Sequence, residues 1–101
     1  MVLHGIEIPE DRIADFCRRN QIRKLALFGS ILTDEFGPDS DVDVLVEFEP
    51  EAHAGFFKFL GLEEELAEML GHKVDLNTQG FLHPRFRGQA VASAEVLYAD
   101  G

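Results

Sequence analysis

The alternation of hydrophobic and polar residues predicts a small domain built from both strands and helices. Short apolar or alternating segments typical of strands lie at 22–28, 41–48, 72–77 and 95–99. Apolar residues at helical spacing lie at 9–19 and 55–70, and a shorter helix is expected at 30–36. In the long helix, the spacing predicts a core stripe of Phe59, Leu62, Leu66, Met69 and Leu70. The glutamates of this helix are expected to face largely outward: Glu63, Glu64, Glu65 and Glu68. Pro9 suits a first helical position, Asn20 a helix stop, and Gly71 the C-terminal end of the long helix.

The connections predict how the strands pair. The linker between 22–28 and 41–48 is too short for a parallel crossover, so these strands should be antiparallel. Segment 41–48, the helix at 55–70 and segment 72–77 form a βαβ unit, which predicts parallel strands and a right-handed connection. We therefore expect an α/β (α+β) fold. It should have a small mixed β-sheet of about four strands, with helices mainly on one face, in a single domain over 1–101.

Three segments have weaker patterns. Residues 1–8 alternate weakly and either add an edge strand or lie over the surface. The first turns of the long helix, including Phe56 and Phe57, are apolar nearly all round, so they are either buried or dock a partner. Residues 78–84 are expected to form a loop, with a weak helix starting at Pro84.

Two aspartates separated by one valine open the segment at 41–48. Side chains alternate between the faces of a strand, so Asp41 and Asp43 share one face, about 7 Å apart. Asp75 stands between two apolar residues of the parallel neighbour, so it should point to the same open face at a similar height. Clustered carboxylates repel one another without a cation, and their oxygens suit a hard divalent ion such as Mg²⁺.

Gly29 and Ser30 end the first predicted strand abruptly, where a helix should begin. A glycine lets an anion approach the backbone closely, and a helix N-terminus offers free N–H groups. Ser30 could also act as a plain helix cap, and the two roles are compatible. A phosphate-binding turn beside paired carboxylates is typical of nucleotide chemistry.

Composition and charge narrow the classes of function. The 101 residues suffice for one core but leave no room for a separate substrate domain. A net charge of −10 argues against direct binding to nucleic acid or an anionic membrane. No apolar run approaches the roughly 20 residues of a membrane span, and the acidic N-terminus is unlike a signal peptide. The single cysteine, Cys17, fits a reducing cytoplasm and a position in the core.

The charge is unevenly distributed. Residues 34–51 contain eight acidic side chains and no basic one. This run is either a solvated surface or charge around a metal site that also attracts a basic partner. We favour the second interpretation because the run contains the paired aspartates. The histidines show no spacing typical of a zinc site: His4, His53, His72 and His83.

The motif Gly29-Ser30, ten residues, then Asp41-x-Asp43 resembles the signature of the DNA polymerase β-type nucleotidyltransferases. With the short chain and the later stretch 71–76, it resembles the minimal nucleotidyltransferases, often antitoxins to HEPN-domain toxins. The likeness covers residues 10–99. It implies a nucleotidyltransferase fold and Mg²⁺-dependent transfer of AMP from ATP to a hydroxyl of a cognate HEPN toxin. The expected acceptor is a tyrosine.

The same resemblance implies a role for each site residue. Asp41 and Asp43 would bridge two Mg²⁺ ions, for which Mn²⁺ can substitute, and Asp75 would hold the ion at the attacking hydroxyl. Gly29 and Ser30 would bind the β- and γ-phosphates of the nucleotide. Such two-metal sites stabilise both the attacking and the leaving oxygen of an in-line displacement.

One position departs from the family pattern. Many relatives carry Arg-Gly where this chain has Thr33-Asp34, and Lys73, Arg85 or Arg87 could supply the missing charge. An alternative function is a non-catalytic antitoxin that neutralises its toxin by binding alone. Transfer to a small molecule such as an antibiotic is disfavoured because the chain lacks an acceptor domain.

Overall fold

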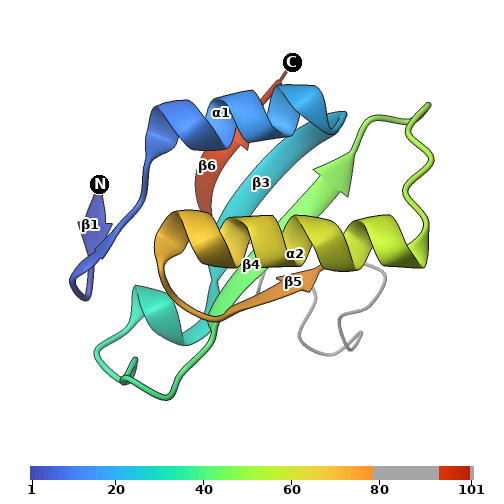
Figure 1. Cartoon of the computed structure of the whole chain (residues 1–101). Helices are drawn as coiled ribbons and strands as arrows, with labels where there is room; N and C mark the ends of the chain where they lie inside the picture. The colour runs from blue at the N-terminus through green and yellow to red at the C-terminus, as the bar shows by residue number, and fades with distance from the viewer. Residues whose placement is uncertain (79–93, 101) are drawn as a thin grey trace.

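A four-stranded mixed sheet organises the fold. A computed structural model describes residues 1–78 and 94–100. The strands are β3 (Ile22–Phe28), β4 (Val42–Phe48), β5 (Val74–Asn77) and β6 (Glu95–Ala99), in the spatial order β5-β4-β3-β6 (Figure 1). β3 is antiparallel to both β4 and β6, whereas β4 and β5 are parallel. The predicted mixed sheet and both strand pairings are therefore confirmed.

Two helices, α1 (Glu10–Arg19) and α2 (Phe56–Leu70), lie across the same face of this sheet (Figure 1). α1 begins one residue later than predicted, with Pro9 at the N-cap, and Asn20 follows its last residue. α2 ends at Gly71, whose φ of 64° is a left-handed conformation that glycine adopts without a steric penalty. The helix residues buried in the core are Ile13, Phe16, Cys17, Leu62, Leu66 and Leu70.

The N-terminal residues form a separate antiparallel pair, β1 (Val2–Leu3) and β2 (Ile6–Glu7). This pair does not join the main sheet, so the alternative of an added edge strand is wrong. Ile6 and Ile8 are nonetheless buried in the main core, which ties the hairpin to the rest of the molecule.

The predicted helix at 30–36 is wrong in type and length, because only a 3₁₀ turn, η1 (Gly29–Leu32), forms there. The hydroxyl of Thr33 donates to the Ser30 carbonyl at 2.9 Å and accepts from the Glu35 N–H at 3.1 Å. These bonds offer the backbone an alternative to helical hydrogen bonds, and Thr33 is accordingly extended. The following residues form the expected turn, in which the Ser40 N–H donates to the Gly37 carbonyl at 3.0 Å.

Two strands begin later than predicted, β4 at Val42 rather than residue 41 and β5 at Val74 rather than residue 72. After the left-handed Gly71 the chain turns back, and the His72 ring hydrogen-bonds the Ser40 carbonyl. Regular pairing resumes where the Lys73 carbonyl accepts a hydrogen bond of 2.9 Å from the Val42 N–H.

The exposure of the first turn of α2 excludes deep burial, one of the two alternatives left open for it. Phe56 and Phe57 are 71% and 86% exposed, so these two rings are not part of the core. Phe59 and Met69, predicted as core residues, are only partly buried. No helix in the described part of the chain is long and apolar enough to cross a membrane.

Glu63 was expected to face outward with the other glutamates of α2, and this expectation is wrong. Its Oε2 accepts a hydrogen bond of 2.8 Å from the backbone N–H of Leu76 in β5. β5 lies at the end of the sheet order, so this contact satisfies a donor that no neighbouring strand reaches. The predicted helix from Pro84, with Arg85 and Arg87, lies outside the described residues.

Candidate functional site

The register between β4 and β5 brings two of the predicted aspartates side by side. Asp43 and Asp75 are direct partners across the parallel pair, and the preceding pair is Val42 and Val74. Both valines are buried in the core, so the alternation along each strand places Asp43 and Asp75 on the opposite face, away from the helices. The predicted placement of the third carboxylate is therefore confirmed.

Asp43 carries the most perturbed carboxyl group of the site. Burial, and after it the negative charges of Asp75 and Asp41, raise the pKa of this carboxyl group to about 6. The Asp43 side chain is half-buried, whereas Asp75 is exposed. The charged form of Asp43 is thus disfavoured both by desolvation and by the neighbouring negative charges. A bound cation would stabilise this charged form.

Gly29 stands against Asp43 at the end of β3. Phe28 pairs with Asp43 across the antiparallel strands, so the next residue, Gly29, begins η1 directly beside the carboxylate. A Cβ atom on Gly29 would collide with the Asp43 carboxylate, and the glycine has a positive φ of 79°. The site therefore requires glycine here for two separate reasons. Ser30 follows at the same turn and is half-buried.

The chemistry of these donors fits a hard divalent cation, but the side chains do not yet converge on one. Carboxylate oxygens are preferred ligands of Mg²⁺, and Asp41, Asp43 and Asp75 supply them on one face. Among residues 1–78 and 94–100, no three His, Cys, Asp or Glu side chains are arranged to hold a metal ion as they stand.

Two histidines without a predicted role pack against the loop that leads to Asp41. The rings of His4 and His72 lie on Phe36, with centroid separations of 5.0 and 5.3 Å. His4 also contacts the Ile31 carbonyl through Nε2 at 3.0 Å. These contacts join the β1–β2 turn, the loop after η1 and the end of α2. Sequence spacing offered no signal for this cluster, because its members are brought together only by the tertiary fold.

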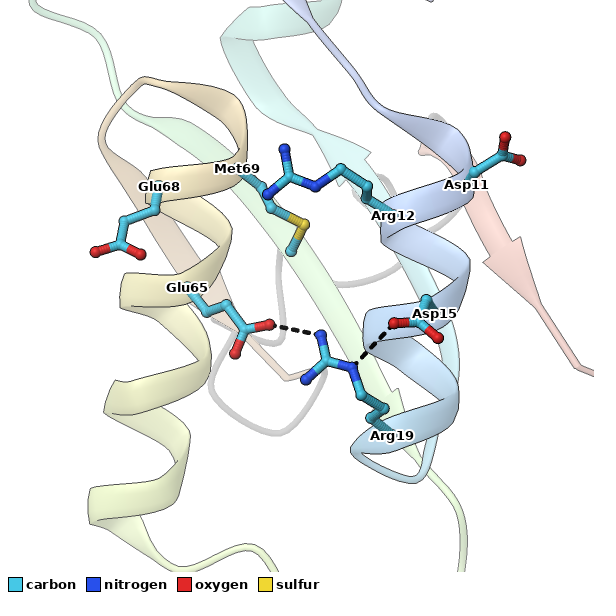
Figure 2. A pocket seen from close by; sticks show the side chains of 7 residues that line it. All are labelled: Asp11, Arg12, Asp15, Arg19, Glu65, Glu68 and Met69. Atoms are coloured by element: carbon cyan, nitrogen blue, oxygen red, sulfur yellow. Dashed lines mark hydrogen bonds and ion pairs between the residues drawn. The ribbon is translucent and has the colours of Figure 1, made fainter.

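A shallow pocket lies on the helical side, between α1 and α2 (Figure 2). There the Arg19 guanidinium bridges Asp15 and Glu65, with N–O distances of 3.1 and 2.8 Å. Both acidic partners and the arginine are substantially exposed, so these ion pairs contribute little to stability. Because the pocket borders the helices, it lies across the sheet from the aspartates. The residues that line it are Asp11, Arg12, Asp15, Arg19, Glu65, Glu68 and Met69.

Comparison with known proteins identifies the family to which this chain belongs. Residues 10–97 match the family described as "Nucleotidyltransferase domain". The chain therefore belongs to the nucleotidyltransferase domain family, as the spacing of Gly29-Ser30 and the aspartates predicted.

Two relatives of this chain are named as protein adenylyltransferases, one of them a candidate. The chain is 40% identical over 63 residues to a candidate protein adenylyltransferase of Methanocaldococcus jannaschii, covering 62% of this chain and 63% of that protein. It is 46% identical over 55 residues to the protein adenylyltransferase MntA of Thermococcus cleftensis, covering 54% of each. The matched region thus spans only about half to two thirds of these relatives.

Solved structures share the fold. A candidate minimal nucleotidyltransferase superposes with a TM-score of 0.69 at 30% identity, covering 84% of this chain and 85% of that one. A toxin–antitoxin structure with AMP-PNP gives 0.71 at 23% identity, covering 91% and 74%. A tri-AMPylated Shewanella oneidensis HEPN toxin in complex with an MNT antitoxin gives 0.63 at 24% identity, covering 89% and 69%. The last two likenesses show the fold alone.

Proposed function

We propose that this chain is a nucleotidyltransferase that transfers AMP from ATP to a hydroxyl of a cognate HEPN toxin and thereby acts as an antitoxin in the cytoplasm. The observation that carries the proposal is the pairing of Asp43 with Asp75 across β4 and β5, with Gly29 against the Asp43 carboxylate. The names of the relatives support the reaction, and the AMPylated toxin complex supports the class of acceptor.

Each site residue has a proposed task. Asp41 and Asp43 would hold two Mg²⁺ ions, or Mn²⁺ in their place, and Asp75 would share the one beside the acceptor. When bound, such ions lower the pKa of the attacking hydroxyl and stabilise charge on the leaving oxygen. Gly29 would let the triphosphate approach the backbone beside Asp43, and Ser30 would hold the β- and γ-phosphates with its hydroxyl and the N–H groups of the turn.

The proposed reaction is a displacement at the α-phosphorus of ATP. The acceptor oxygen, expected to belong to a tyrosine, forms a bond to this phosphorus and its proton passes to solvent. The bond from the α-phosphorus to the bridging oxygen breaks, and pyrophosphate leaves. Orientation of the acceptor is worth roughly 7–11 kcal/mol of barrier, so the rate of transfer should depend on how the partner protein presents its hydroxyl to the site.

A second candidate function is neutralisation of the toxin by binding alone. One observation favours it: Thr33-Asp34 stands where many relatives carry Arg-Gly. The partner would then be inhibited without being modified.

Labelled nucleotides separate these functions. The purified chain would be incubated with each labelled nucleoside triphosphate, Mg²⁺ and the protein encoded beside it. Our proposal predicts label on the partner from ATP, and no label with Asp41→Ala. A partner that is inhibited yet carries no label would favour binding alone. Label on neither protein, with an active partner, would contradict both functions.

A further inference from the structure

The strand register places the positively charged Lys73 beside the aspartate site. It directly precedes β5, and the pairing of Val42 with Val74 places it opposite Asp41. Strand alternation puts its side chain on the same face as Asp75. Its Nζ lies 3.9 Å from the Asp41 Oδ1.

This ion pair is poorly suited to a structural role. The Lys73 side chain is 81% exposed and the Asp41 side chain 38% exposed, and exposed pairs contribute only about 0.2–1 kcal/mol to stability. Among the ion pairs within residues 1–78 and 94–100, it is the one that includes a site aspartate. The acidic run at 34–51 contains no cation of its own, so Lys73 supplies positive charge that this surface lacks.

We propose that Lys73 is a charge-exchange residue: it pairs with Asp41 in the metal-free protein and turns to the phosphates when metal and nucleotide bind. A metal ion held by Asp41 would compete with the Lys73 ammonium group for the same carboxylate, so the lysine would be released when the ion binds. Its flexible four-carbon stem then lets the freed ammonium reach an anion beside the site. The identity of that anion, a triphosphate, rests on the proposed function.

The experiment measures two affinities that should change in opposite directions. Lys73→Met would be titrated calorimetrically with Mn²⁺ alone, and then with a non-hydrolysable ATP analogue in the presence of Mn²⁺. Loss of the competing ammonium should tighten Mn²⁺ binding by up to about fivefold, which corresponds to the upper end of the range for an exposed ion pair. Loss of a charged phosphate contact should weaken binding of the analogue about tenfold.

Two further variants are controls. Lys73→Arg keeps the positive charge and should retain most of the affinity for the analogue. Lys58→Met removes an exposed lysine from α2, on the helical side of the sheet, and should change neither affinity. Thermal melts of the metal-free variants check that each one folds.

The possible results separate this inference from the proposed function. If the parent binds both ligands but Lys73→Met matches Lys58→Met, the charge exchange is wrong and the proposed function stands. If both affinities fall together, Lys73 acts only as a structural residue and the inference is again overturned. If the parent binds neither Mn²⁺ nor the analogue, both proposals fail.

Discussion

Replacing Asp43 by Asn should stabilise the metal-free protein above about pH 6. The folded-state pKa of this carboxyl is about 6, raised from 3.8 by burial and then by Asp75 and Asp41. The folded protein therefore binds the Asp43 proton more tightly than the unfolded chain does. Stability falls as the pH rises from about 4 to about 6, and the full cost is present above that range. Asparagine keeps the shape of the side chain but removes the charge that causes this cost.

The size of the effect follows from the pKa. A shift from 3.8 to about 6 corresponds to roughly 3 kcal/mol if no screening applies. Asp43 is only partly buried, and screening by solvent reduces this to about 1 kcal/mol. For a domain of this size, 1 kcal/mol changes the melting temperature by about 4–8 °C. At pH 5, midway between the two pKa values, the difference should be about half of its value at pH 8.

Thermal melts of both proteins in excess chelator, at pH 5 and pH 8, provide the assay. Asp34→Asn is the matched control, because it removes an exposed carboxylate from the same acidic run and should leave the melting temperature nearly unchanged. Added Mg²⁺ should stabilise the parent and have less effect on Asp43→Asn. An Asp43→Asn protein that melts well below the parent at pH 8 would show that the carboxylate is structural, and the reasoning would be wrong.

Three further predictions, two of them with a matched control variant, test other parts of the structure. Gly29→Ala should lower stability by at least about 1–2 kcal/mol, because of its positive φ and the clash with the carboxylate, and should weaken Mn²⁺ binding. Gly37→Ala, which meets nothing within 4 Å, should be nearly neutral in the same melts and titrations. Glu63→Ala should cost about 1–3 kcal/mol in denaturant unfolding because it leaves a β5 N–H unsatisfied, whereas exposed Glu64→Ala should change stability little. Burial raises the pKa of Cys17 to about 12, so thiol reagents at pH 8 should label it only at the rate of unfolding; rapid native labelling would contradict this.

Much of the sheet could be predicted from local pattern alone. The period-2 alternation of valine and aspartate determines which face each residue occupies, and it correctly placed Asp43 and Asp75 on one face. Chain connectivity added the parallel pairing of β4 with β5, because a helix of suitable length separates them. These predictions succeeded because they depend on short-range periodicity and connection length.

The errors have tertiary or side-chain causes. The helix predicted at 30–36 failed because the Thr33 hydroxyl bonds the local backbone, a competition that periodicity does not reveal. Glu63 faces the sheet edge because a β5 N–H there needs a partner, which the sequence of α2 alone cannot show. The exposure of Phe57 was equally undetermined, since an all-round apolar turn is compatible with burial or with a surface. Convergence of the aspartates on a cation depends on rotamers, so it was beyond the sequence pattern.

The central claim is tested most directly by the intact mass of the partner protein. The protein encoded beside this chain would be incubated with the purified chain, ATP and Mg²⁺. Its intact mass would be measured by mass spectrometry before and after the incubation. Our account predicts a gain of one or more AMP units on the partner, which disappears with Asp41→Ala or with Asp75→Ala. A partner that keeps its original mass while being held inactive in a complex would contradict the enzymatic account and leave neutralisation by binding.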